Sequence, residues 1–260
     1  MKSLMIVGTS SSCGKSFITA ALLRMLRNKG YAAAPFKAQN ISSKFYITGD
    51  HSEIAYSTYI QALSAGVVPE ADMNPILIKP AYDETQIFLN GKLFHTGCYT
   101  KYGDFLPEIR AGIENSFQRL AAKYDILIIE GAGSTAEINL ANEDVANIFT
   151  AKITKSPLLL VSDIHYGGVF AAIHGTIDLL DESIKDQLEG FLINRYQGIK
   201  DVLQSGIDVL EKKHGVPCAG VLPYQQDIVV PDEQGFDLMA DLLESNMDLG
   251  LISRLLGVSL

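Results

Sequence analysis

The sequence predicts an α/β protein with a doubly wound, mostly parallel sheet. Short apolar runs that indicate buried strands alternate along the chain with segments of helical periodicity, which is typical of a parallel sheet covered by helices. In the segment 125–130, residues 126–129 are all apolar and stand between two carboxylates, as expected for a strand buried on both faces. A glycine-bounded loop joins the first strand to the first helix. Ligands of such sheets bind at the carboxyl ends of the strands.

The expected elements follow in chain order. The first half contains a strand at 4–7, a helix beginning near 15, a strand at 31–36, a polar loop at 41–52 and a helix at about 53–65. The segment 72–80 is expected to lead into a short strand. A hairpin is expected at 86–94, because Asn90-Gly91 between apolar residues is a strong turn signal. The second half contains a helix at 105–123, strands at 125–130, 157–162, 190–193 and 218–221, and helices near 169–180 and 199–214.

We interpret residues 1–232 as one domain and residues 233–260 as a C-terminal extension that includes an amphipathic segment, 238–256. Apolar residues make up 47% of the chain, which is enough to bury a sizeable core. The net charge of −9 argues against nucleic-acid binding, which needs clustered lysine and arginine.

The cysteines and the apolar runs bear on the cellular compartment. Cys13, Cys98 and Cys218 are widely spaced and form no CxxC pair, which favours reduced thiols over disulfides or a zinc site. There is no signal-peptide pattern, and no apolar run approaches the ~18 residues of a membrane helix. We therefore expect a cytoplasmic protein without membrane contact.

The loop between the first strand and the first helix predicts a nucleotide phosphate site. Backbone N–H groups at a helix N-terminus face an anion, and the helix dipole favours negative charge there. Lys15 is expected to reach the β- and γ-phosphates, and the Ser16 hydroxyl to ligate Mg²⁺. The alternative is a chance Gly/Ser-rich turn. The nucleotide-binding candidates are Gly8, Thr9, Ser12, Cys13, Gly14, Lys15 and Ser16.

Carboxylates and a lysine near strand ends are candidates for the chemistry. Asp50 and Glu130 are predicted to join Ser16 in holding Mg²⁺, which prefers oxygen ligands. Asp50 and Glu53 could instead cap a helix and interact with its first turn. Lys37 could stabilise a transferring phosphoryl group or be a solvated lysine. The histidines show no metal-ligand spacing and are interpreted as surface or core residues: His51, His95, His165, His174 and His214.

Seven blocks occur in the order of one family. They are residues 8–16, 35–40, 72–80, 130–140, 167–171, 193–195 and 220–224. The chain resembles the cobyric acid synthase family, within the dethiobiotin synthetase-like P-loop superfamily. The most specific blocks are Gln39-Asn40, Asp72-Met73-Asn74-Pro75 and Glu130-Gly131-Ala132-Gly133-Ser134. The phosphate loop has one residue more between its glycines than the usual motif, and this is the superfamily's own form.

The resemblance implies a P-loop ligase that uses ATP and Mg²⁺ to amidate peripheral carboxylates of a corrinoid. ATP would phosphorylate the carboxylate, and ammonia would displace phosphate from the acyl phosphate. Lys15, Lys37, Asp50 and Glu130 would be the catalytic residues, and Asn194 would bind the adenine. A homodimer is also implied. The residues expected on the corrinoid or dimer side are Gln39, Asn40, Asp72, Asn74, Glu137 and Asn139.

The sequence departs from the family pattern in three places. Family members usually continue into a glutaminase domain, and this chain stops where that domain would begin. Ammonia is therefore expected from solution or from a separate glutaminase subunit. His165-Tyr166 replaces the family's Asp-Arg, and Lys44-Phe45 replaces an Asn-Ser. These changes remove charges and hydrogen-bonding groups near the expected substrate.

Two other functions share the same ATP site. One is a dethiobiotin synthetase-like, carboxylate-activating enzyme, a carboxylase that closes a ring on a small diamine; the Asp-Met-Asn-Pro block favours the corrinoid instead. The other is a non-catalytic regulatory or partition-type module in which ATP controls dimerisation. Such modules generally carry a second lysine early in the loop, where this chain has Ser10 and Ser11.

Overall fold

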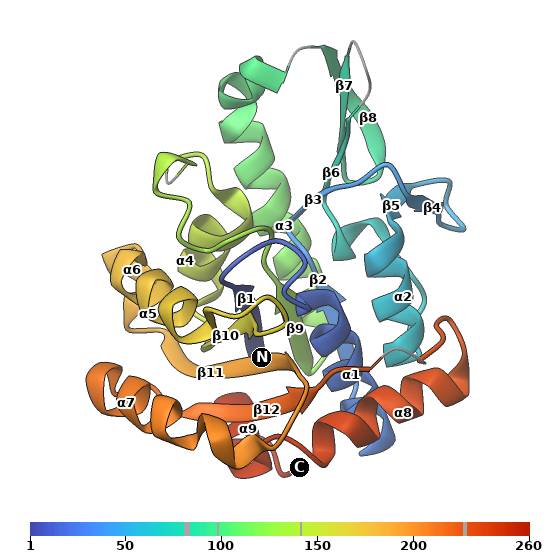
Figure 1. Ribbon diagram of the computed structural model, residues 1–260. Coiled ribbons are helices and arrows are strands. Elements are labelled where there is room, and N and C mark those ends of the chain that lie inside the picture. Colours follow the sequence, from blue (N-terminus) through green and yellow to red (C-terminus); the bar gives the residue numbers. More distant parts are fainter. Residues whose placement is uncertain (81–83, 98, 141, 226–227) are drawn as a thin grey trace.

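A six-stranded parallel sheet forms the centre of the computed structural model, which describes residues 1–80, 84–97, 99–140, 142–225 and 228–260 (Figure 1). Its strand order is β12-β11-β10-β1-β9-β2, and every pair is parallel. The strands are β1 (Lys2–Gly8), β2 (Ala33–Phe36), β9 (Ile126–Glu130), β10 (Leu158–Asp163), β11 (Leu188–Tyr196) and β12 (Cys218–Pro223). The predicted doubly wound sheet is confirmed.

Helices cover both faces of this sheet, and the strands are buried from both sides. In β1, Met5 and Val7 belong to one core cluster, whereas Leu4 and Ile6 belong to the other. The first cluster includes residues of α3 (Leu106–Lys123), α4 (Thr150–Thr154), α5 (Val169–Leu179), α6 (Glu182–Lys185) and α7 (Gln204–His214). The second includes residues of α1 (Lys15–Asn28), α8 (Glu233–Glu244) and α9 (Leu249–Leu256). Short helical turns lie at Ala71–Met73, Tyr99–Phe105, Ile138–Leu140, Val145–Phe149 and Lys200–Leu203.

A second sheet extends from the central one in the order β3-β6-β7-β8. Its strands are β3 (Gln39–Ile41), β6 (Ile76–Lys79), β7 (Thr85–Leu89) and β8 (Lys92–Gly97). The predicted hairpin at 86–94 is confirmed as β7 and β8. Asn90 and Gly91 both have positive φ, 48° and 76°, as a two-residue hairpin turn requires.

The segment 41–52 is not the plain loop that its polarity predicts. It contains β4 (Phe45–Ile47), which pairs with β5 (Glu53–Ala55), and α2 (Tyr56–Ala65) follows directly. The Tyr46 and Tyr59 rings stack with centroids 3.9 Å apart, which joins this hairpin to α2. Phe45 and Ile47 are exposed. The prediction failed because a hairpin exposed to solvent does not need a regular apolar pattern.

Residues 233–260 form two helices that complete one face of the central sheet. Phe236 and Met239 of α8, and Leu251 and Ile252 of α9, are buried in the cluster that contains α1. Arg24 of α1 also pairs with two carboxylates of α8. Within the described ranges, no helix is long and apolar enough to cross a membrane. Cys98 lies outside those ranges.

Candidate functional site

The loop between β1 and α1 can be formed only with glycine at two positions. Gly14 has φ 107°, and a Cβ built there would lie 2.0 Å from Asn194 Nδ2. A Cβ on Gly8 would lie 2.6 Å from Cys13 Sγ and 2.8 Å from Lys15 Nζ. Helix α1 begins at Lys15, so the first free N–H groups of the helix lie beside the loop. This is the geometry of an anion site at a helix N-terminus.

Lys15 holds its ammonium group inside the loop. Its Nζ donates to the carbonyl oxygens of Ser10 at 2.9 Å and Gly133 at 2.6 Å, and lies 3.8 Å from Cys13 Sγ. Burial lowers the pKa of Lys15 below its ordinary value, although Cys13 and Glu130 act in the opposite direction. The lysine therefore links the loop after β1 to the loop after β9.

Glu130, the last residue of β9, is the centre of a buried polar network. It is 1% exposed and accepts hydrogen bonds from Ser16 Oγ and Lys37 Nζ, both at 2.7 Å. It also accepts one from Gln61 Nε2 of α2. Burial acts to raise the pKa of Glu130, but the Lys37 charge and these hydrogen bonds outweigh it, so the pKa lies below its ordinary value. Glu130 is ionised at neutral pH.

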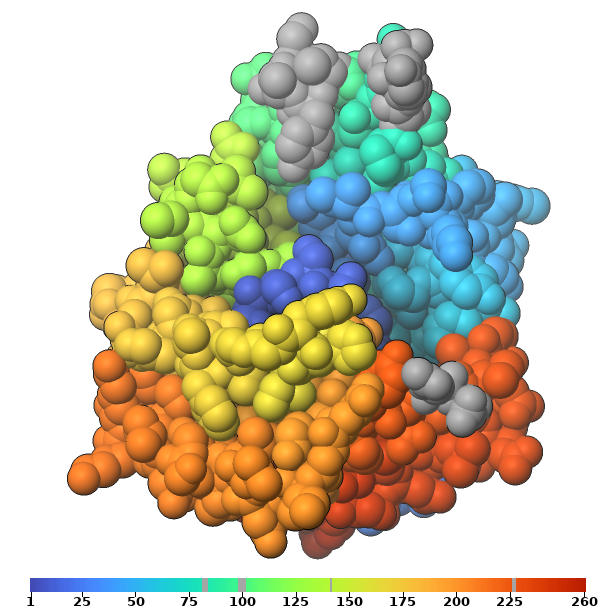
Figure 2. All heavy atoms as spheres, viewed as in Figure 1, coloured from blue at the N-terminus to red at the C-terminus, as the bar shows by residue number. Residues whose placement is uncertain are grey.

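A cavity of about 560 Å³ opens beside these groups. Figure 2 shows the loop, in dark blue, at the bottom of a hollow between green and light blue segments on one side and yellow segments on the other. The cavity walls include Lys15, Ser16, Lys37, Asn40 and Glu130. The phosphate loop and the predicted lysine and carboxylate therefore share one cavity at the carboxyl edge of the sheet.

Asn194 and Arg195 of β11 close one side of the loop. Asn194 is 5% exposed and donates to the Cys13 carbonyl oxygen at 2.9 Å. Arg195 Nη1 donates to the Ser12 carbonyl oxygen at 3.0 Å and to Asp163 Oδ2 at 2.7 Å. Asn194 and Arg195 line a cavity of about 100 Å³ together with Gly14 and Phe17. Thr9, the first residue after β1, places its Oγ1 3.0 Å from the Oγ of Ser162, which belongs to β10.

Asp50 lies apart from the other predicted Mg²⁺ ligands. It is an exposed residue in the turn between β4 and β5, and its carboxylate accepts hydrogen bonds from Thr48 and Ser52. The Thr48 hydrogen bond lowers the pKa of Asp50. Asp50 is not among the described residues that line the cavity of Ser16 and Glu130. In this structure it stabilises a turn, and Ala55 rather than Asp50 precedes the first residue of α2.

Two of the predicted substrate residues have structural roles. Asn74 is fully buried; it donates to the carbonyl oxygens of Lys37 and Ile76 and accepts from the Ala55 N–H. Its amide is used entirely in joining three backbone segments, so it does not reach a substrate here. The Asp72 carboxylate forms an ion pair with Arg119 of α3 and accepts two hydrogen bonds from its guanidinium group, at 2.6 and 2.7 Å.

The other predicted substrate residues lie at or near cavities. Asn40 borders the phosphate cavity, whereas Gln39 and Glu137 line an adjoining cavity of about 230 Å³. The two cavities share Ala132 and Gly133 in their walls. Asn139 is exposed.

His165 and Tyr166 lie in the exposed turn that follows β10. The His165 ring stacks on Tyr224 with centroids 5.3 Å apart, and Tyr166 is 92% exposed. The residues that replace the family's Asp-Arg therefore form an exposed aromatic group at the carboxyl edge of the sheet.

Gln61 and Arg195 are the members of the site that sequence reasoning did not single out. Gln61 is 1% exposed and contacts Glu130, but its Oε1 has no hydrogen-bond partner. Arg195 stands next to Asn194 in a recognised block and could have been found there. Gln61 gave no such signal, because the helix face that meets Glu130 is defined only by the packing of α2.

A family model described as the CobQ/CobB/MinD/ParA nucleotide binding domain matches residues 4–235. The chain belongs to this family. Members share a nucleotide-binding domain, and the match covers the loop, β9 and the Asn194 region in one continuous alignment. The chance-turn interpretation of the Gly8–Ser16 loop is thereby excluded.

Curated relatives of this family member confirm the resemblance seen in the sequence blocks. The chain is 43% identical over 246 residues to a probable cobyric acid synthase of Methanosarcina barkeri, covering 94% of this chain and 50% of that protein. It is 44% identical over 244 residues to the cobyric acid synthase of Nostoc sp., covering 92% of this chain and 49% of that protein. The chain thus spans about half the length of these relatives.

Solved structures support the fold of the family member. The signal recognition particle receptor FtsY of Elizabethkingia anophelis, in complex with GDP, aligns with a TM-score of 0.52 at 15% identity. The alignment covers 93% of this chain and 63% of that one. At this identity the likeness concerns the fold alone, a parallel sheet with a nucleotide loop after its first strand.

Proposed function

We propose that this chain is the ATP-dependent ligase part of a cobyric acid synthase-like enzyme of cobalamin biosynthesis. It would phosphorylate a side-chain carboxylate of a corrinoid and allow ammonia to replace the phosphate. The observation that carries this proposal is that four side chains meet around one cavity: Lys15, Ser16, Lys37 and Glu130. The identity of 43% to proteins named cobyric acid synthase indicates the substrate class.

The donor set beside the loop suits Mg²⁺. Ser16 Oγ and Glu130 Oε1 are 2.7 Å apart, and hydroxyl and carboxylate oxygens are the ligands that Mg²⁺ takes from proteins, together with phosphate oxygens and water. We assign Ser16 and Glu130 as the residues that would hold it. The ion would stabilise the negative charge of the phosphate oxygens and help to align the phosphates. Asp50 could join them only after its hairpin has moved.

Two lysines of the chain would balance the negative charge of the reacting groups. Lys15 lies inside the loop, where its ammonium can exchange the Ser10 and Gly133 carbonyls for phosphate oxygens. Lys37 is 6% exposed and is oriented by Glu130 toward the same cavity. A fixed cation in a site with little water stabilises charge more strongly than the same cation in solution. Asn194, buried against Gly14, would bind the adenine beside the smaller cavity.

The carboxylate to be activated would enter from the cavity lined by Gln39 and Glu137, which adjoins the phosphate cavity. Its oxygen would attack the γ-phosphorus and release ADP, and ammonia would then attack the acyl carbon and release phosphate. We propose that ammonia comes from solution or from a separate glutaminase unit. We also propose a homodimer, which would cover the apolar side chains of Leu140, 49% exposed at this cavity, and of the nearby Ile138, 66% exposed.

The test is ADP release with Mg-ATP and ammonium, with and without adenosylcobyrinic acid a,c-diamide. We expect corrinoid-dependent ADP release and an amidated product by mass spectrometry. Lys15→Ala should abolish both, whereas Lys212→Ala, at an exposed lysine of α7, should leave both unchanged. An equal rate of ATP turnover with and without the corrinoid would contradict the proposed substrate. Retention of nucleotide affinity in that case would still support the nucleotide site.

A further inference from the structure

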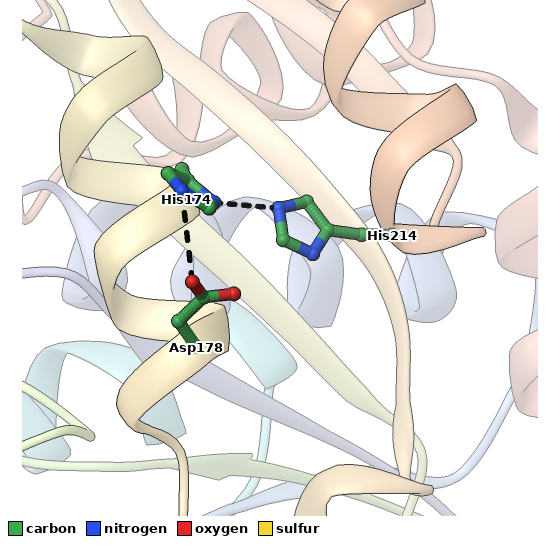
Figure 3. A group of neighbouring side chains, drawn as sticks. All are labelled: His174, Asp178 and His214. Atoms are coloured by element: carbon green, nitrogen blue, oxygen red, sulfur yellow. Dashed lines mark hydrogen bonds and ion pairs between the residues drawn. The ribbon is translucent and has the colours of Figure 1, made fainter.

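Three side chains of two helices come together outside the group of residues that line the phosphate cavity. His174 and Asp178 belong to α5, and His214 is the last residue of α7 (Figure 3). Within the part of the chain that the structure describes, one ligand atom from each of the three lies within 4.8 Å of the other two. This group could not be predicted from the sequence, since its two histidines are 40 residues apart.

The geometry follows from helix spacing and helix packing. Residues four apart on a helix lie one turn apart on the same face, which places His174 one helical turn before Asp178. Their Nε2 and Oδ2 atoms are 3.6 Å apart. Across the gap between the helices, His174 Nδ1 lies 2.9 Å from His214 Nε2. Figure 3 shows the His174 ring next to both His214 and Asp178, with one interaction to each.

We propose that His174, Asp178 and His214 form a binding site for a divalent transition-metal ion, with Zn²⁺ as the typical occupant. Two imidazole nitrogens and one carboxylate oxygen are donors that Zn²⁺ takes at about 2.0 Å. Nitrogens around such an ion stand roughly 3.3 Å apart in a tetrahedron. The two observed separations involve different nitrogens of His174, so its ring would turn to present one of them beside both His214 and Asp178. Three protein ligands leave a fourth position for water.

The electrostatic surroundings favour a cation at this point. Asp178 is one residue from the C-terminal end of α5, and His214 ends α7. Each helix has 11 residues, and its C-terminus carries partial negative charge from unpaired carbonyls. Burial and the neighbouring His174 lower the pKa of His214.

A lysine ammonium group competes with the proposed metal ion for one of the histidine nitrogens. Lys213 Nζ lies 3.1 Å from His174 Nε2, and Lys213 is exposed. This lysine must swing into solvent before a metal ion can use that nitrogen. Lys185 is a second positive charge acting on the site. The bound ion would join the C-terminal ends of α5 and α7, so it should also raise the melting temperature.

The experiment measures Zn²⁺ binding by competition with a chromophoric chelator, on full-length protein freed of metal. We expect one Zn²⁺ per chain and an X-ray absorption spectrum with two histidine ligands. The double variant His174→Gln/His214→Gln should weaken Zn²⁺ binding at least about tenfold. Asp178→Asn, which hardly changes the shape of the side chain, should also weaken Zn²⁺ binding. His165→Gln, at an exposed histidine elsewhere, is the matched control and should bind as the natural chain does.

Lys213→Gln gives an independent test, because removal of the competing cation should tighten Zn²⁺ binding. Unchanged or weaker binding would place the ion away from this group and overturn the proposal. Equal affinity of the natural chain and the double histidine variant would overturn it as well, as would the absence of stoichiometric binding. Circular dichroism and nucleotide affinity check that each variant is folded. The proposed ligase activity enters none of these measurements.

Discussion

Removal of Lys37 tests whether the buried network around Glu130 is correctly described. In Lys37→Met, the Glu130 carboxylate keeps the hydrogen bonds from Ser16 and Gln61 but loses the lysine 2.7 Å away. Glu130 is 1% exposed, so water replaces that partner poorly. Breaking a buried ion pair from one side costs about 3–5 kcal/mol of unfolding free energy. For a chain of this size that corresponds to a fall in melting temperature of roughly 6–20 °C.

Urea unfolding of four proteins measures this effect: the natural chain, Lys37→Met, Glu130→Gln and the double variant. The double variant should recover much of the loss, because a neutral amide is cheaper to bury than an unpaired carboxylate. Lys185→Met is the control, since it breaks the exposed pair between Lys185 and Glu182, which is worth about 0–1 kcal/mol. Equal losses in Lys37→Met and in the double variant would refute the reasoning.

The pH dependence adds a second criterion. The pKa of Glu130 is lowered in the folded chain, so its ionisation stabilises the fold above the ordinary pKa of 4.5, and this contribution is lost as the pH falls through the folded value. In Lys37→Met, the lysine charge that contributes most to lowering the pKa of Glu130 is absent. Burial then raises the pKa of Glu130. The stability gap between the two proteins should therefore be largest at neutral pH and should narrow in acid. A gap that does not change with pH would contradict the assignment.

Three further substitutions test the site. Lys15→Ala should abolish ATP turnover with little change in urea midpoint, and turnover at the natural rate would exclude the loop as the phosphate site. Gly14→Ala should cost about 1–3 kcal/mol and weaken binding of a fluorescent ATP analogue, because its φ is 107° and its Cβ would strike Asn194; unchanged affinity would contradict this. Asp50→Asn should leave turnover within about twofold, because its carboxylate only closes a turn; a loss of about a hundredfold would instead support Asp50 as a Mg²⁺ ligand.

The parts of the fold that could be predicted from sequence are those with short-range signals. The apolar run before Glu130, the Asn90-Gly91 turn and the Gly8–Ser16 loop each depend on neighbouring residues, and each is found where expected. The hairpin at 45–55 was missed because its outer strand positions face solvent and lack a regular apolar pattern.

The direction of individual side chains was harder to predict than the elements that carry them. Asn74 stands in a block specific to the family, yet its amide joins the backbones of Lys37, Ala55 and Ile76. Gln61 carries no motif, yet it reaches Glu130. A motif identifies residues that the family pattern contains, but it does not separate those that hold the scaffold from those that contact a ligand. That difference depends on packing between segments distant in sequence.

The position of β1 in the middle of the sheet has a consequence for how the chain folds. β1 precedes the other strands of the sheet in the sequence, but Lys2 pairs with Ile126 and Met5 with Leu158. Both of its edges therefore stay unpaired until the chain has been made as far as β9. Such long sequence separations slow folding, and exposed strand edges promote aggregation meanwhile. We therefore expect the phosphate loop to form late, and fragments that end before β9 to aggregate.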